Sequence, residues 1–200
     1  MKIDTTSKDS ILSSLDLITR DLILNKAVKI NDKYYSFIDI EVYYWHDNHQ
    51  DEFANGINHL KPIGEFEAHR YGIDLSLGNE KKNGFGGILI CGLFDNQNKA
   101  TGVIEKPHVI RTFLNQLHTG ENTIEIVEFK NDWNDLFTSK RLNLGVDDTL
   151  NKKTFKNSQY KYLAKNEKLF LAYKGKEQIF RDSNLTDDEI QELLGYKLKR

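Results

Sequence analysis

The sequence has few of the residues that cross-link a chain or divide it into separate units. It holds a single cysteine, Cys91, which excludes a disulfide framework and any zinc site built from several thiolates. It has only two prolines and no Ser- or Gly-rich stretch, which argues against two domains joined by a flexible linker. We therefore expect one domain over residues 1–200, long enough to bury a hydrophobic core.

Long apolar runs and an excess of one charge are also absent. No run approaches the ~20 apolar residues that span a bilayer, and the first ten residues contain no apolar core of a signal peptide. With 28 Lys and Arg against 30 Asp and Glu, the net charge of −2 excludes a uniformly basic nucleic-acid-binding protein. We expect a soluble cytoplasmic protein without a membrane partner.

The residues that are plentiful, aromatic and β-branched ones, predict more strand than helix. Apolar spacing and cap residues predict helices over 7–24, 105–117 and 186–195. Alternating or continuous apolar runs predict a hairpin over 27–45 that turns at Asn31-Asp32, and strands over 66–78, 84–94, 124–129 and within 159–173. The sequence therefore predicts an α+β fold, with a mainly antiparallel sheet flanked by a few short helices.

The charges are unevenly distributed along the chain. Residues 39–67 hold seven acidic side chains and one lysine, whereas residues 140–176 hold ten Lys and Arg against three acidic side chains. Aromatic residues such as Tyr160 and Tyr162 alternate with these lysines. A basic segment with interleaved aromatics suits contact with phosphates and bases, although a solvated lysine-rich surface explains it equally well.

Glu41 is the carboxylate with the most unusual surroundings, because apolar and aromatic residues flank it from Phe37 to Trp45. Alternation places it on one strand face with Asp39 and Tyr43. Burial among aromatics is expected to raise its pKa, which would suit a general base near neutral pH. The alternative is that Glu41 lies on the solvent face of an edge strand.

Histidines and the cysteine offer weaker candidates. His46 and His49, with Asp47, Asp51 and Glu52 beside them, supply nitrogen and oxygen ligands for a divalent metal, but their spacing matches no fixed metal motif. Cys91 lies in an apolar strand, where a thiol is usually an inert small hydrophobe.

The order of several short motifs resembles the alkyladenine (3-methyladenine) DNA glycosylase family. The similarity covers about residues 10–165 and leaves 166–200 as a C-terminal extension. Its motifs are Leu24-Asn25-Lys26 followed by Ile40-Glu41-Val42-Tyr43, then Arg70-Tyr71-Gly72-Ile73 with the strand from Gly87 to Leu93, Lys106-Pro107 opening a helix, Arg141-Leu142-Asn143-Leu144, and Tyr160-Lys161-Tyr162-Leu163.

This resemblance implies a metal-independent enzyme of DNA repair that needs no cofactor and removes a modified base by hydrolysis of the N-glycosidic bond. Such base excision requires the target nucleotide to be flipped out of the stack. The resemblance assigns the following positions: Glu41 as the base that activates water; Tyr43, with Tyr44 and His69, as walls of the base pocket; Asn79 and Cys91 at the positions of further pocket residues; Tyr71 as the wedge in the duplex; and Lys152, Lys153, Lys156 and Lys161 as phosphate contacts.

Two other classes of function remain open on the sequence alone. A non-catalytic module on the same scaffold would bind a nucleotide or a protein without cleaving it. A metal hydrolase would use His46, His49 and the neighbouring carboxylates. We expect DNA as the partner and a monomer as the working form.

Overall fold

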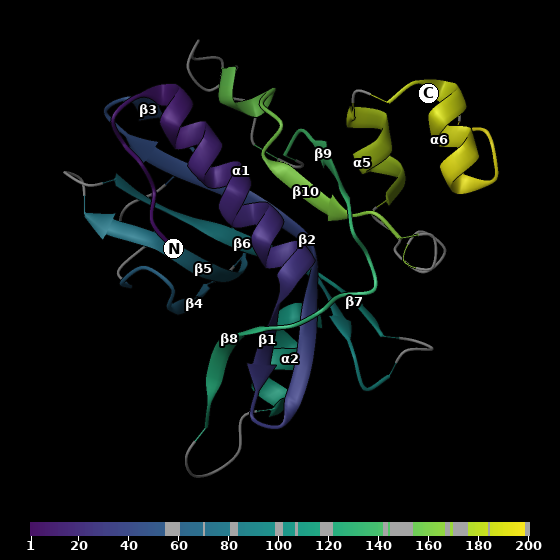
Figure 1. The fold of residues 1–200 in the computed structure, drawn as a ribbon, viewed down its shortest axis with the longest axis horizontal. Helices are drawn as coiled ribbons and strands as arrows, with labels where there is room; N and C mark the ends of the chain where they lie inside the picture. The colour runs from purple at the N-terminus through teal and green to yellow at the C-terminus, as the bar shows by residue number, and fades with distance from the viewer. Residues whose placement is uncertain are drawn as a thin grey trace.

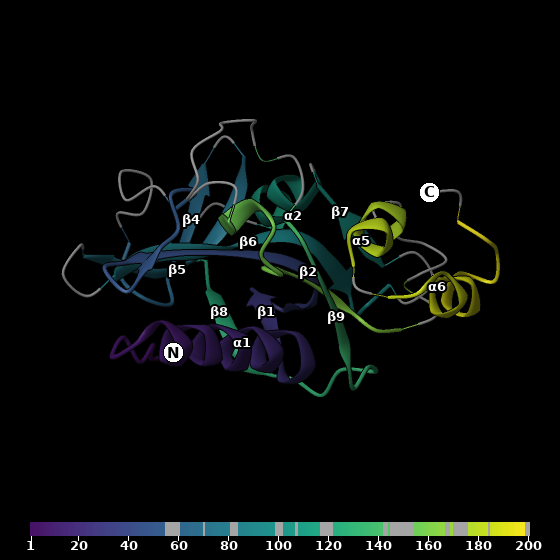
Figure 2. The ribbon, with the colours of Figure 1, turned by 90° about the horizontal axis from the view of Figure 1, so that it is seen from above.

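A curled antiparallel sheet dominates the protein, which we describe from a computed structural model (Figures 1 and 2). The described residues are 1–54, 61–69, 71–80, 84–98, 102–106, 108–116, 122–141, 144, 154–166, 169, 176–183 and 185–198. Within them, ten strands form one sheet in which β4, β5, β6, β2, β1 and β8 are successive neighbours. The α+β class expected from the sequence is confirmed.

Helix α1 (Lys8–Asn25) lies along one face of this sheet, as Figure 2 shows. Ser7 caps its first turn by accepting a hydrogen bond from the backbone N–H of Ser10 at 3.1 Å. Its buried stripe includes Ile11, Leu15 and Leu22, which pack against the sheet. The helix follows the predicted boundaries almost residue for residue because the cap and the apolar period are both local signals.

Strand β2 (Lys33–His46) is the longest strand and organises the sheet. One edge pairs with β6 (Gly84–Asp95), and the other pairs in turn with β1 (Lys26–Ile30), β10 (Lys161–Ala164) and β3 (His49–Gln50). The predicted hairpin between β1 and β2 is confirmed, and its turn places Asn31 at a φ of 53°.

Alternation along β2 assigns its side chains to two faces. Tyr162 pairs with Ile40 and lies beside Thr19 of α1, so Ile40, Val42 and Tyr44 face the helix and the main core. Glu41 and Tyr43, in between, face the opposite side. This division separates the apolar core from the polar candidates.

The remaining elements extend the sheet and cover its ends. They are β4 (Phe66–His69), β5 (Gly72–Glu80), β7 (Val103–Glu105), α2 (His108–Gln116), β8 (Ile124–Glu128), β9 (Leu136–Ser139), α5 (Lys176–Asp182) and α6 (Asp187–Leu194). Helix α2 packs on β5, β6 and β7, while α5 and α6 lie at the far end of the sheet near β9 (Figure 1). The C-terminal helix is capped, as predicted, by a capping box of Thr186 and Glu189, and it ends at Gly195 with a φ of 74°.

Two local features differ from a plain succession of strands and loops. The polar stretch that follows β2 contains strand β3, and its Asp51 is fully buried. The glycines at the start of β6 permit a close approach of β2, because a side chain at Gly86 would collide with the backbone of Tyr43 and Tyr44. Within the described residues, no helix is long and apolar enough to cross a membrane.

Candidate functional site

One row of side chains crosses four neighbouring strands on the face opposite α1, and three of its four members are charged or polar. The register pairs Lys161 of β10 with Glu41 of β2, Glu41 with Leu89 of β6, and Leu89 with Asp74 of β5. Residues paired across antiparallel strands project from the same face of the sheet. Side chains from distant parts of the chain therefore meet on this face.

Three of these side chains form a buried ion-pair cluster, here named the Lys161 cluster: Lys161, Asp39 and Glu41. The Lys161 Nζ donates to Asp39 Oδ1 at 2.6 Å and to Glu41 Oε1 at 3.0 Å. The side chains of Lys161 and Asp39 are 3% and 1% exposed, whereas that of Glu41 retains 10%. Glu41 is therefore the least buried member of the cluster.

The Lys161 cluster fixes the charge of Glu41. Burial alone would raise the pKa of this carboxyl, but the charges of Lys161, Lys106 and Arg141, together with the Lys161 hydrogen bond, outweigh it and lower the pKa below its ordinary value. The sequence-based expectation of a raised pKa is wrong, because it took account of the aromatic neighbours and not of the lysine. Glu41 is a carboxylate throughout the neutral pH range.

A second polar group lies beside the first. The phenol of Tyr43 donates to Asp74 Oδ2, and the same oxygen lies 3.1 Å from Nε2 of His69. Burial, followed by the charge of Asp74, raises the pKa of Tyr43 well above its ordinary value, so its O–H remains protonated. The hydrogen bond to Asp74 thus fixes the orientation of the Tyr43 ring, which lies on the same sheet face as Glu41.

Tyr71 and Cys91 also lie near this group. Tyr71 is 57% exposed in the turn between β4 and β5, and its ring packs edge-on against His69 with centroids 6.0 Å apart. Cys91 is buried beside Glu41, and burial, with the Glu41 charge, raises its pKa far above its ordinary value. Its thiol is therefore protonated and unsuited to nucleophilic attack.

Other expected site residues lie elsewhere. Tyr44, expected as a pocket wall, points to the opposite face from Glu41 and is 1% exposed in the core, because adjacent strand residues alternate. Asn79 lies at the exposed far end of β5, five residues beyond Asp74 and so roughly 17 Å along the strand. Neither side chain belongs to the group around Glu41.

The four lysines expected to contact phosphates differ in their surroundings. Lys161 is buried and bound to two carboxylates, which is incompatible with a contact to a phosphate backbone. Lys156 is half-buried in a helical turn, and Lys152 and Lys153 lie outside the described residues. The alternation of lysines with aromatics in 160–163 therefore reflects an internal lysine rather than a surface track.

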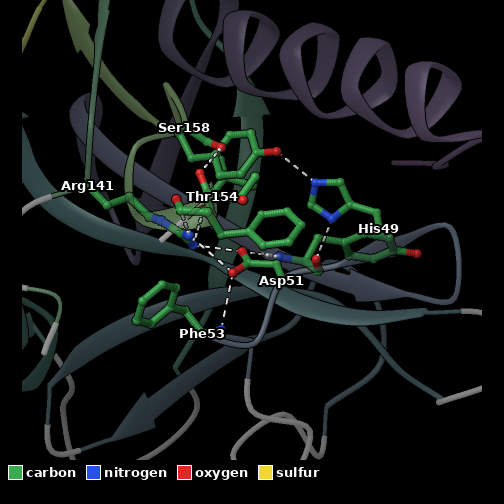
Figure 3. A network of polar contacts seen from close by, with 10 residues as sticks. His49, Asp51, Phe53, Arg141, Thr154 and Ser158 are labelled. Atoms are coloured by element: carbon green, nitrogen blue, oxygen red, sulfur yellow. Dashed lines mark hydrogen bonds and ion pairs between the residues drawn. The ribbon is translucent and has the colours of Figure 1, made fainter. Parts of the chain in front are cut away.

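A separate network surrounds Arg141 and is shown in Figure 3. Its guanidinium binds both carboxylate oxygens of Asp51, at 2.7 and 3.1 Å, and also donates to the carbonyls of Val42 and Phe155. The rings of Phe53 and Tyr160 lie 5.1 and 5.2 Å from it. We call this group the Arg141 network.

His49 extends the Arg141 network (Figure 3). Burial lowers its pKa against the effects of the Tyr44 carbonyl and the Asp51 charge, so the ring is neutral. Nδ1 then donates to the Tyr44 carbonyl at 2.7 Å, and Nε2 accepts from the Tyr160 hydroxyl at 2.8 Å. The Val42 N–H donates to the Tyr160 carbonyl, and this bond fixes the entry to β10 just before Lys161.

The histidines that a metal hydrolase would use are engaged in hydrogen bonds within the protein. Both ring nitrogens of His49 are engaged by the protein, and Nδ1 of His46 accepts a bond from the Asn48 backbone. Over the described part of the chain, no group of three or more His, Cys, Asp or Glu side chains is arranged to hold a metal ion.

Three contributors to the site were not predicted from the sequence: Lys161 as the partner of Glu41, Asp74 as the partner of Tyr43, and Lys106 as a nearby cation. One signal was available for the first. A lysine within the short apolar strand Tyr160–Leu163 is costly to bury and therefore requires an acidic partner. Nothing in the sequence identified which acid it was.

One groove lies on the α1 side, away from these residues. It has a volume of about 820 Å³ and is lined by Met1, Leu17, Phe66, Ile124 and their neighbours. None of the Lys161 cluster contributes to it.

Comparison with known proteins found no matching family model, no matching curated protein and no matching solved structure.

Proposed function

We propose that the protein hydrolyses the N-glycosidic bond of a modified nucleotide in DNA, with Glu41 as its catalytic carboxylate. The observation that supports this proposal is the combination of properties at Glu41. It is ionised, it is held by a buried lysine, and it is the least buried member of the Lys161 cluster.

The chemistry of glycosidic cleavage suits such a carboxylate. Positive charge develops on the sugar ring as the bond to the base breaks, and a fixed negative charge beside the anomeric carbon stabilises that transition state. The same carboxylate accepts a hydrogen bond from the attacking water and orients it. A carboxylate with a lowered pKa acts mainly through this electrostatic stabilisation, because it is a weak proton acceptor.

The aromatic side chains nearby suit recognition of a base. Tyr43 offers a fixed ring next to Glu41, and Tyr71 presents an exposed ring from the β4–β5 turn. In the proposed reaction Tyr43 stacks on the extruded base, and Tyr71 fills the space that the base leaves in the duplex. Both roles match those that the resemblance to alkyladenine DNA glycosylases assigns to these positions.

Release of free base tests the proposal. The wild-type protein is incubated with duplex and single-stranded oligonucleotides carrying alkylated, deaminated or hypermodified bases, and released bases are identified by chromatography with mass spectrometry. We expect release from at least one substrate and its loss in Glu41→Gln. Glu125→Gln, an exposed glutamate on β8, is the matched control and should retain the activity. No release from any substrate would reject the proposal.

A non-catalytic binding module is the second candidate, and Lys161 favours it. If Lys161 only neutralises the buried charge of Glu41, this carboxylate takes no part in a reaction. The aromatic side chains beside it would then bind a nucleotide without cleaving it. In that case the oligonucleotides bind without release of base, and Glu41→Gln leaves their affinity unchanged. The salt dependence of binding then reports how many phosphates are contacted.

A further inference from the structure

We propose that Lys161 is a positioning residue for Glu41: anchored on Asp39, its ammonium holds one oxygen of the Glu41 carboxylate and fixes the group in its charged form. This inference rests on the proposed function, in which Glu41 acts on the substrate. Lys161 itself contacts no substrate in this arrangement, because the two carboxylates enclose it.

The two contacts of Lys161 differ in length and in the burial of the carboxylate that each one binds. Lys161 Nζ is 2.6 Å from Asp39 and 3.0 Å from Glu41, so the shorter contact is to the carboxylate that is almost completely buried. Asp39 and Glu41 are two positions apart on β2, and Lys161 pairs directly with Glu41 on β10. The sheet therefore presets the separation of all three groups before any ligand arrives.

The backbone supports of Lys161 are rigid on both sides. Strand β10 is paired with β2 and β9, and the Val42 N–H fixes the carbonyl of Tyr160 at 2.8 Å. The Arg141 network fixes the Tyr160 side chain through His49. A lysine side chain ordinarily has many rotamers, but this one has little freedom to leave Glu41.

Charged and titratable groups face Glu41 from every element packed against it. Lys161 comes from β10, Asp39 and Tyr43 from β2, Cys91 from β6 and Lys106 from the end of β7; the charge of Arg141, after β9, also acts on Glu41. Cys91 and Tyr43 are uncharged at neutral pH. Lys161 is the cation that contacts the carboxylate directly, whereas Lys106 is exposed.

The pH at which Glu41 titrates tests this role directly and needs no substrate. Glutamate side-chain carbons are labelled with ¹³C, and the Glu41 signal is assigned from its loss in Glu41→Gln. In the wild type we expect it to titrate below the other glutamates that lack a cationic partner. In Lys161→Met the titration moves to higher pH, and in Lys161→Arg, which restores the positive charge, it returns toward the wild-type pH.

Two further variants keep the test decisive. Lys165→Met removes an exposed lysine just after β10, whose Nζ lies 3.8 Å from Asp135 Oδ2, and should leave the Glu41 titration unchanged. Asp39→Asn removes a negative charge and leaves Lys161 to Glu41 alone, so the Glu41 titration moves to lower pH. This variant carries the test if Lys161→Met does not fold.

The outcomes for Lys161 and for the proposed function are separable. An unchanged Glu41 titration in folded Lys161→Met, or a shift to higher pH in Asp39→Asn, overturns the positioning role even if the wild type releases base. Loss of base release in Lys161→Met without a titration shift means a structural lysine and also overturns it. If no protein releases base, the proposed function fails, and the titrations still decide whether Lys161 fixes Glu41.

Discussion

Arg141 and Lys161 are both buried cations that contact strand β2, and each binds an aspartate whose side chain is at most 1% exposed. In the Arg141 network one cation binds one aspartate: two aromatic rings lie near the guanidinium, its other hydrogen bonds go to backbone carbonyls, and its buried Nε has no hydrogen-bond partner among the described residues. The Lys161 cluster has a second carboxylate, Glu41, which retains exposed surface. The Arg141 network therefore pairs one cation with one anion, whereas the Lys161 cluster pairs one cation with two anions.

This difference separates a purely structural ion pair from one that leaves a carboxylate available to a substrate. A buried ion pair with every charge matched stabilises a particular arrangement of the chain and has nothing left to offer a ligand. An extra carboxylate at the edge of such a pair retains negative charge that a developing positive charge on a substrate can use. On this reasoning Arg141 stabilises the fold, and Lys161 holds the carboxylate on which the proposed function depends.

The largest effect on stability is expected at the Arg141 network. Arg141→Met leaves Asp51 buried without its cation and removes two bonds to backbone carbonyls, so the free energy of unfolding should fall by about 3–5 kcal/mol. Chemical denaturation of the wild type and the variant measures it. A loss below about 1 kcal/mol would show that the Arg141 network contributes no more than an exposed ion pair.

The Lys161 cluster should respond less, and in a pH-dependent way. Lys161→Met leaves Asp39 and Glu41 without their cation and should cost about 3 kcal/mol at pH 8. The deficit shrinks as the pH falls, because the two carboxyls then take up protons instead of remaining as buried charges. Unfolding curves at several pH values measure the trend, and a deficit independent of pH would contradict it.

The wild type carries the complementary pH signature. Because the pKa of Glu41 is lowered in the folded state, its contribution to stability is present above the unfolded-state pKa and is lost as pH falls through the folded-state value. The difference in unfolding free energy between wild type and Glu41→Gln should therefore narrow in acid. A difference that widens in acid would mean that Glu41 is protonated in the native protein.

Tyr43→Phe should have a smaller effect on stability. It removes one hydrogen bond to the carboxylate of Asp74, which His69 still contacts, so we expect a loss of about 1.5–3 kcal/mol. The substitution keeps the aromatic ring, so base release should persist if stacking is the role of Tyr43. Loss of base release with unchanged stability would instead assign a role in the reaction to the hydroxyl.

The smallest effect is expected at an exposed pair. Lys165 lies 3.8 Å from Asp135, and their side chains are 44% and 55% exposed. Lys165→Met should change the free energy of unfolding by less than about 1 kcal/mol, because solvent screens the pair. A loss comparable with that of Lys161→Met would remove the distinction between the buried lysine of β10 and the exposed lysine that follows the strand.

The sequence predicted those features whose cause is local. The capping box of Thr186 and Glu189 and the turn at Asn31 each depend on residues within a few positions of one another. The apolar period of α1 is equally local. These signals sufficed for the α+β class and for the approximate boundaries of the three predicted helices, whereas the single strand expected over 66–78 is the antiparallel pair β4 and β5.

The candidate site depends on contacts that sequence spacing does not encode. Lys161 and Glu41 are 120 positions apart, and Arg141 and Asp51 are 90 apart, so only the register of the folded sheet brings them together. Alternation did place Glu41 with Tyr43, but the pKa of Glu41 depends on a lysine from another strand. Adjacency in sequence was a poor guide to the site, since Tyr44, which was expected beside Tyr43 in the pocket, faces the opposite side of the sheet.

The rate of base release by Glu41→Gln tests most directly whether Glu41 is a reactive group rather than a second structural acid. With the best substrate from the oligonucleotide panel, single-turnover rates are compared for wild type and variant at pH 7, together with their unfolding curves. We expect a rate at least about 100-fold lower in a variant that remains folded, since Lys161 retains Asp39. Equal rates in the two proteins would contradict a catalytic Glu41.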